Sequence, residues 1–180
     1  ARYYQDRLYL NDGKGNFTKS EQLPEINSSG SCVIAADYDK DGDLDLFIGG
    51  RVVPGNYGAS PKSIVLKNTN GSFKNKTKPI LGTDALGMVT SALWTDYDND
   101  GWQDLIVVGE WMPITIFKNN KGILTEKIEI KNSNGWWNSI NGGDFDNDGD
   151  IDYILGNLGE NSVFKASDDH PVTLALGDFD

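Results

Sequence analysis

One acidic nonapeptide occurs three times in the 180-residue chain and constrains the fold more than any other feature. It reads DYDKDGDLD over residues 37–45, DYDNDGWQD over 96–104 and DFDNDGDID over 144–152, and a fourth copy begins at Asp178 and Asp180. Each full copy has Asp at places 1, 3, 5 and 9 and Gly at place 6. Alternate residues of a tight loop can turn their carboxylates inward, and glycine permits the sharp reversal. The repeat therefore predicts three tight turns with converging carboxylates.

Converging carboxylates at this spacing indicate a calcium loop, because Ca²⁺ takes about six to eight oxygen ligands. The loop is not an EF-hand, since place 12 is Ile48, Val107 or Leu155 and not the Glu that an EF-hand requires. Short apolar runs such as CVIAA and LFIGG precede and follow each loop, and such runs are typical of strands. We therefore expect each ion in the turn between two strands.

Hairpins alternate with these loops along the chain. Segments such as LYLNDGKGNF and SIVLKNTNGSF carry the Asn and Gly residues that favour tight hairpin turns. Successive loops begin 59 and 48 residues apart, and the fourth begins after a further 34. A period of about 50 residues that holds four short strands is typical of a propeller blade. The sequence thus predicts an all-β fold, a β-propeller of four-stranded antiparallel blades.

The chain divides into one propeller segment with three blades and partial blades at both ends. The boundaries are a partial blade at 1–30, blades at 31–80, 88–130 and 137–168, and the start of a further blade at 171–180. The third blade lacks a full outer hairpin. Propellers close a ring to avoid exposed strand edges, so we expect an open arc whose edges are covered by the rest of its own propeller. A four-bladed ring, closed between the first hairpin and the last strand, is the alternative.

The pattern D-x-D-x-D-G-x-x-D followed by an apolar strand, together with LYLNDGKGNF, resembles the FG-GAP or VCBS repeats of integrin-α-like β-propellers. The resemblance covers nearly the whole chain. It implies three complete Ca²⁺ sites, each held by the side chains of places 1, 3, 5 and 9 and by the backbone carbonyl of place 7. The implied side-chain ligands are Asp37, Asp39, Asp41 and Asp45; Asp96, Asp98, Asp100 and Asp104; and Asp144, Asp146, Asp148 and Asp152. The place 7 residues are Asp43, Trp102 and Asp150.

Charge and composition exclude several classes of partner. The formal net charge is −11, and the three loops carry five, four and five of the 27 acidic residues. The 16 Lys and Arg residues are not clustered, so we expect no nucleic-acid partner. No apolar run reaches the roughly 18 residues of a transmembrane segment.

The single cysteine, Cys32, lies in an apolar strand and is expected to be a core residue.

The calcium loops also favour a location. Extracellular calcium modules bind with a Kd of about 10⁻⁴ to 10⁻³ M, so such loops would be filled outside a cell. This favours a secreted or cell-surface protein, and we expect the surface to be the outer surface of a bacterium. We expect no enzyme: the loops use the paired carboxylates, and the lone His170 lies in the loop sequence SDDHP. The alternative is the scaffold segment of a propeller enzyme that acts on polysaccharide, such as a lyase.

Aromatic residues give the candidate ligand site. Trp94 falls within an inner strand and is expected in the core, whereas Tyr57, Trp111, Trp136 and Trp137 lie in or beside turns. Flat rings at a loop face can stack on sugars or anchor protein partners, and packing between blades is the alternative. We therefore expect a calcium-stabilised, non-catalytic recognition or scaffolding module, for adhesion or for glycan or protein binding, whose ligand the sequence does not identify.

Overall fold

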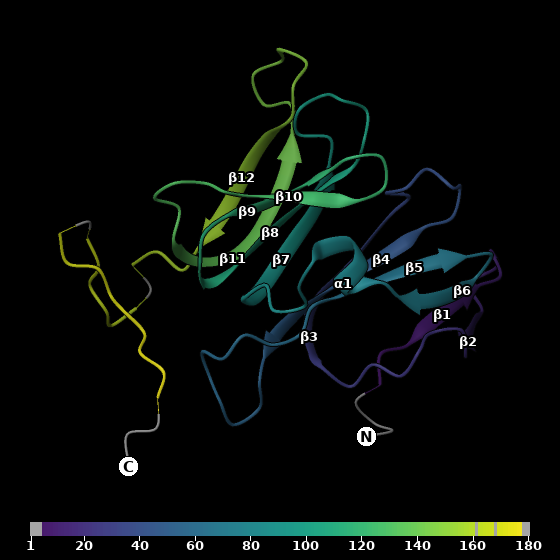
Figure 1. The fold of residues 1–180 in the computed structure, drawn as a ribbon, viewed down its shortest axis with the longest axis horizontal. Coiled ribbons are helices and arrows are strands. Elements are labelled where there is room, and N and C mark those ends of the chain that lie inside the picture. Colours follow the sequence, from purple (N-terminus) through teal and green to yellow (C-terminus); the bar gives the residue numbers. More distant parts are fainter. Residues whose placement is uncertain (1–4, 161, 168, 178–180) are drawn as a thin grey trace.

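The computed structural model describes residues 5–160, 162–167 and 169–177, and its regular structure is almost entirely antiparallel β-strand (Figure 1). This confirms the predicted all-β class. The strands are β1 (Leu8–Asn11), β2 (Phe17–Ser20), β3 (Ser29–Ala36), β4 (Asp45–Val52), β5 (Ile64–Thr69), β6 (Ser72–Asn75), β7 (Met88–Thr95), β8 (Asp104–Met112), β9 (Thr115–Asn119), β10 (Leu124–Glu129), β11 (Gly135–Gly143) and β12 (Asp152–Asn157), and one short helix, α1, spans Thr77–Leu81.

The strands pair mostly with their neighbours in sequence. Strands β3 to β6 form one antiparallel sheet in chain order, here called the first sheet. Strands β7 to β10 pair in the same way and form the second sheet. The hairpin β11–β12 follows, and β11 also joins β8 through Gly135 beside Met112 and Trp136 beside Glu110. Each acidic nonapeptide therefore lies in the turn between the first two strands of a unit.

Turn chemistry explains the hairpins. The turn between β5 and β6 places Asn70 and Gly71 at φ values of 52° and 85°, the left-handed conformation that Asn-Gly hairpin turns require. The hairpin β1–β2 forms a separate two-stranded sheet, and Asp12 accepts hydrogen bonds from the backbone of Lys14 and Asn16 in its turn. The hairpins expected from these Asn and Gly residues are thus formed.

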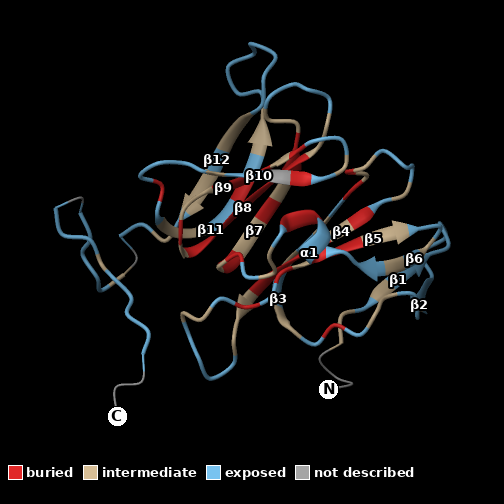
Figure 2. Cartoon of the chain, viewed as in Figure 1, coloured by how far each residue is buried: buried red, intermediate tan, exposed pale blue. Residues whose placement is uncertain are grey.

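Two hydrophobic cores meet at β8 (Figure 2). Leu105 and Val107 pack into the core between the first and second sheets, where Tyr38 and Trp94 stack with ring centroids 5.6 Å apart. Ile106 packs into the other core, against β11 and β12. Because side chains alternate across a strand, β8 is buried on both faces. Trp94 is a core residue, as the sequence predicts.

The C-terminal segment differs from expectation. The sequence predicts an inner strand beginning at 171, but residues 171–177 form no strand, and none forms in the described part of 158–167 either. A strand needs a backbone partner, and the topology of the described residues places none beside this segment. Leu174 and Leu176 lie instead against Gly58. Asp178 and Asp180 lie outside the described residues.

The residues that the structure describes do not form the closed four-bladed ring. Among the described residues, β1 pairs with β2 alone, and no hydrogen-bonded ladder joins it to the C-terminal segment. In Figure 1, β7 and β8 lie between the first sheet and the hairpin β11–β12, and the C-terminal segment lies apart from the sheets. No helix in the described ranges has the length and apolar character needed to cross a membrane.

Candidate functional site

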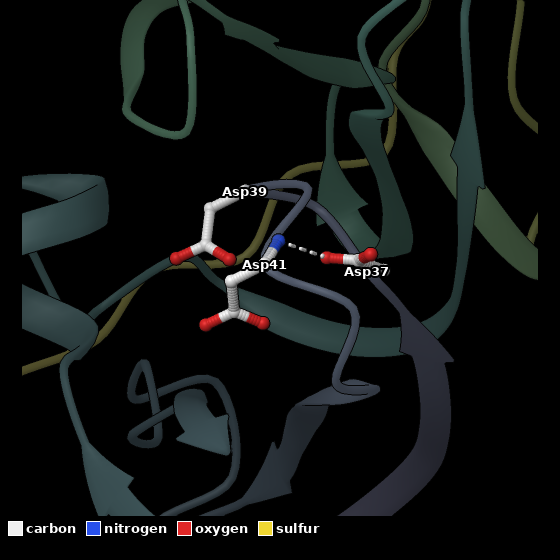
Figure 3. A group of neighbouring side chains, drawn as sticks. All are labelled: Asp37, Asp39 and Asp41. Atoms are coloured by element: carbon white, nitrogen blue, oxygen red, sulfur yellow. Dashed lines mark hydrogen bonds between the residues drawn. The ribbon is translucent and has the colours of Figure 1, made fainter. Parts of the chain in front are cut away.

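All three acidic loops fold in the same way. In the first loop, Lys40 and Gly42 have φ values of 58° and 91°, and the corresponding residues of the other loops are also left-handed. The backbone N–H groups of Asp41 and Gly42 donate to the two carboxylate oxygens of Asp37, each at 3.0 Å. Figure 3 shows the bond from the Asp41 N–H to Asp37, together with the side chains of Asp39 and Asp41. Place 1 therefore fixes the turn while places 3 and 5 present their carboxylates.

The loops bring predicted ligands together. In each loop, one carboxylate oxygen from each of three Asp residues lies within 4.8 Å of the others. The groups are Asp37, Asp39 and Asp41; Asp96, Asp98 and Asp104; and Asp144, Asp146 and Asp152. The remaining side-chain ligands that the sequence predicts are Asp45, Asp100 and Asp148. Asp100 and Asp148 accept the N–H of the residue at place 7, at 2.9 Å in both loops.

The first loop fits a cation. Asp39 Oδ1 and Asp45 Oδ2 are buried carboxylate oxygens with no hydrogen-bond partner. The pKa of Asp45 is raised to about 6: burial is the main cause, the charges of Asp39 and Asp41 add to it, and a hydrogen bond from Asn68 acts against it. Unpaired buried carboxylate oxygens are costly unless a positive charge compensates them. Hard oxygen donors in this arrangement suit Ca²⁺.

The place 7 side chains make contacts outside their own loops. Asp43 Oδ2 accepts the N–H of Asn70 at 2.7 Å, so this side chain bonds the outer hairpin. Lys40 Nζ lies 4.3 Å from the centroid of the Trp102 ring, and Asn99 Nδ2 donates to Asp150 Oδ1 at 2.6 Å.

Two of these contacts connect neighbouring loops, and in both of them the residue at place 4 of one loop contacts the residue at place 7 of the next loop. Lys40 and Trp102 connect the first loop to the second, and Asn99 and Asp150 connect the second to the third. The loops are therefore joined along one edge of the molecule.

Two lysines that the sequence analysis missed face the loops. Lys67 Nζ pairs with Asp39 and lies 3.2 Å from Asp41 Oδ2. Lys118 pairs in the same way with Asp98 and Asp100. These hydrogen bonds raise the pKa of both lysines. The repeated Lys-Asn pair in LKNTNG and FKNNKG was the available signal, since both lysines hold the same place in their hairpins.

The asparagine after each lysine connects the loop to its outer hairpin. The N–H of Asn68 donates to Asp45 Oδ1 at 2.7 Å, and the N–H of Asn119 donates to Asp104 Oδ1 at 2.6 Å. Asn119 Nδ2 also donates to the carbonyl of Tyr38, which precedes place 3 of the first loop. The carboxylate at place 9 is thus held by its own hairpin, and the second hairpin contacts the neighbouring loop.

Three of the four predicted ligand-binding aromatics lie together. Tyr57 and Trp136 donate hydrogen bonds to the buried carboxylate of Glu110, and Trp111 donates to the Tyr57 hydroxyl. Trp137 does not join them, because adjacent strand residues point to opposite faces: its indole donates to the carbonyl of Ser133, and its ring packs into the core beside β11. Glu110 was missed, because its sequence context resembles a plain buried strand.

Two other residues lie outside these sites. His170 is exposed, and its backbone N–H donates to Ser167. Cys32 is half-buried against the core between the first and second sheets, and burial raises the pKa of its thiol. Neither contacts a metal loop in the described residues.

A family model described as FG-GAP-like repeat matches residues 1–48 and 96–155 of the chain. The two matched ranges cover more than half of the sequence and include all three acidic loops in full. FG-GAP-like repeats are typical of extracellular proteins. No curated protein matches the chain.

Proposed function

The chain belongs to the FG-GAP-like repeat family, and we propose that it is a calcium-stabilised β-propeller segment of a secreted or cell-surface protein. Its role is non-catalytic recognition or scaffolding. The first and second sheets are complete blades, and the hairpin β11–β12 supplies the inner strands of a third. Further blades of the same propeller cover the remaining strand edges, because propellers close their rings with about four to eight blades.

One observation carries this proposal: the convergence of three carboxylates in each acidic loop. In the first loop, two buried carboxylate oxygens lack any hydrogen-bond partner, which is costly without a cation. The Asp side chains at places 1, 3, 5 and 9 would hold Ca²⁺, and the ion would supply the positive charge that keeps these turns folded. The carboxylates are thus used for structure, which argues for recognition or scaffolding and against acid–base catalysis.

Thermal unfolding with calcium and with chelator tests the proposal. At about 1 mM calcium, each site should add roughly 0.5 to 1.5 kcal/mol to the free energy of unfolding. Asp39→Ala, Asp98→Ala and Asp146→Ala should each lower the melting temperature in calcium and change it little in chelator. Asp84→Ala, outside the loops, is the matched control and should respond equally in both conditions. Equal destabilisation by the loop variants in calcium and in chelator would rule out a metal role.

A further inference from the structure

A buried acid organises the aromatic residues at the end of β8. Glu110 is only 4% exposed and accepts three side-chain hydrogen bonds. Arg51 Nη2 and Trp136 Nε1 donate to Oε1, each at 2.6 Å, and the hydroxyl of Tyr57 donates to Oε2 at 2.8 Å. Trp111 Nε1 donates in turn to the Tyr57 oxygen at 3.0 Å. We call these five residues the Glu110 cluster.

The Glu110 cluster lies far from the metal loops. β8 begins at Asp104, in the second acidic loop, and reaches Glu110 six residues later, about 20 Å along the strand. Arg51 comes from the end of β4 and Trp136 from the start of β11. Two sheets and the third hairpin thus meet at the edge opposite the calcium loops, where each unit contributes a polar or aromatic side chain.

The aromatic rings of the Glu110 cluster are partly open to solvent. The rings of Trp111 and Trp136 lie 5.3 Å apart between centroids and are tilted by 48°. Tyr57 is 45% exposed, although its hydroxyl is bonded to Glu110. A surface that combines flat apolar rings with fixed polar groups suits a ligand that is itself apolar on one face and polar at its rim.

The backbone at Trp111 gives an independent sign of function. Its φ is 59°, in the left-handed region that bulky side chains rarely adopt. Strain of this kind persists where the surrounding structure enforces it and is concentrated at ligand sites. A glycine would relieve the strain, so the indole is held at this position against the preference of the backbone.

Charge narrows the ligand class. The side chain of Arg51 is 33% exposed and pairs with Glu110, so the cluster has no net charge from this pair. One of the five N–H donors of Arg51 is used in this bond, and no other described residue accepts from the side chain. The remaining donors suit hydroxyl groups. The formal charge of the chain, −11, disfavours an acidic ligand.

We propose that the Glu110 cluster binds a neutral pyranose unit of an oligosaccharide, stacked on Trp111 and Tyr57, with its hydroxyl groups accepting hydrogen bonds from Arg51. Trp136 and Glu110 position these residues. The proposal rests on the recognition role given above and names its ligand class. Stacking satisfies the apolar face of the sugar, while Arg51 satisfies its polar rim.

Titration calorimetry with the full chain in about 2 mM calcium tests this site. The probes are neutral hexasaccharides of α-1,4-glucose, β-1,4-glucose, β-1,4-mannose and β-1,4-xylose. At least one should bind, and Trp111→Gly should weaken its binding about tenfold or more while leaving the melting temperature unchanged or higher. Trp102→Ala, a tryptophan in the second metal loop, is the control and should keep the affinity within about twofold.

Other outcomes separate the two proposals. If calcium stabilises the chain but none of the four neutral hexasaccharides binds, the sugar site is wrong and the calcium role stands. Equal binding by Trp111→Gly and the unaltered chain would also overturn the site. If Trp111→Gly fails to fold, Tyr57→Ala takes its place, and unchanged sugar affinity in that variant would overturn the proposal. Loss of the calcium effect would tell against the proposed function instead.

Discussion

Glu110 keeps its charge in a buried position because its neighbours compensate for lost water. Burial raises the pKa of Glu110, but hydrogen bonds from Arg51, Tyr57 and Trp136 outweigh burial and lower the pKa from its ordinary value of 4.5. A lowered folded pKa contributes stability that is fully present above the pKa of the unfolded carboxyl. This contribution is lost as pH falls through the folded pKa.

Glu110→Gln should therefore lower the free energy of unfolding at pH 7 by about 1–3 kcal/mol, because three donors lose a charged acceptor. The difference from the unaltered chain should shrink as pH falls below 4.5, where the carboxyl of the unfolded chain becomes protonated. Urea unfolding of both proteins from pH 7 to pH 3.5 measures this. A difference that stays constant over the whole pH range would show that the charge of Glu110 contributes nothing to stability.

Lys118 places a positive charge beside the carboxylates of the second loop, where calcium would also bind. Lys118→Met removes this competitor and should raise the calcium affinity of the loop, by up to about fivefold for a solvent-accessible pair. In chelator the same variant should melt at a lower temperature, since Asp98 and Asp100 lose their counter-charge.

Calcium titration by calorimetry measures the effect of Lys118→Met, with Lys131→Met as a control on an exposed lysine away from the loops. Unchanged or weaker calcium binding in Lys118→Met would show that the ammonium group and the ion do not compete. The third loop has no such lysine among its described contacts, so it should bind calcium without this competition.

At the scale of elements, consecutive loops contact each other through places 4 and 7. Asn99 and Asn147 occupy place 4 of the second and third loops, with φ values of 56° and 65°. Only Asn99 bonds the next loop in the described structure, through Asp150. Glycine tolerates this conformation, so Asn99→Gly and Asn147→Gly make the same change to the backbone. Among the described residues, the two variants differ in the loss of the contact with Asp150.

Asn99→Gly should therefore destabilise the chain by about 0.5–1 kcal/mol more than Asn147→Gly does, which is the net value of one exposed hydrogen bond. Chemical unfolding of the two variants in calcium gives the difference directly. Equal stabilities would mean that the contact between Asn99 and Asp150 holds no free energy and that the loops fold independently of one another.

The sequence predicts local features of these elements and misses distant ones. The nonapeptide loops and the Asn70-Gly71 turn follow from residues that are close along the chain. The contact of Lys67 with Asp39 joins residues 28 positions apart, and no local pattern specifies it. Trp136 and Trp137 are adjacent in sequence but lie in different environments, which depends on how β11 joins β8.

The strand expected from 171 shows the same limit. An apolar alternating segment becomes a strand only beside a hydrogen-bonding partner, and the sequence does not specify that partner. Residues 171–177 therefore lack the structure that their pattern predicts.

At the scale of the whole molecule, β8 is the strand that contributes to both the core between the first and second sheets and the core against β11 and β12. Its residues from Asp104 to Met112 are buried except Trp111. Leu105, Val107 and Met112 belong to one core, and Ile106 and Val108 belong to the other. β8 also hydrogen-bonds β7 on one side and β9 on the other. The hairpin β1–β2 is the opposite case, because its strands pair only with each other and Phe17 is 64% exposed.

Hydrogen exchange should follow this difference. Amides of β8 should exchange most slowly, through global unfolding, because opening this strand disrupts both cores, whereas β1 and β2 should exchange through local opening. Calcium should then slow exchange in β8 by the full increase in the free energy of unfolding and leave β1 and β2 nearly unchanged. Exchange followed by mass spectrometry in calcium and in chelator measures both effects. Equal protection in β8 and β1, or a calcium effect confined to the acidic loops, would contradict a molecule that unfolds through its central strand.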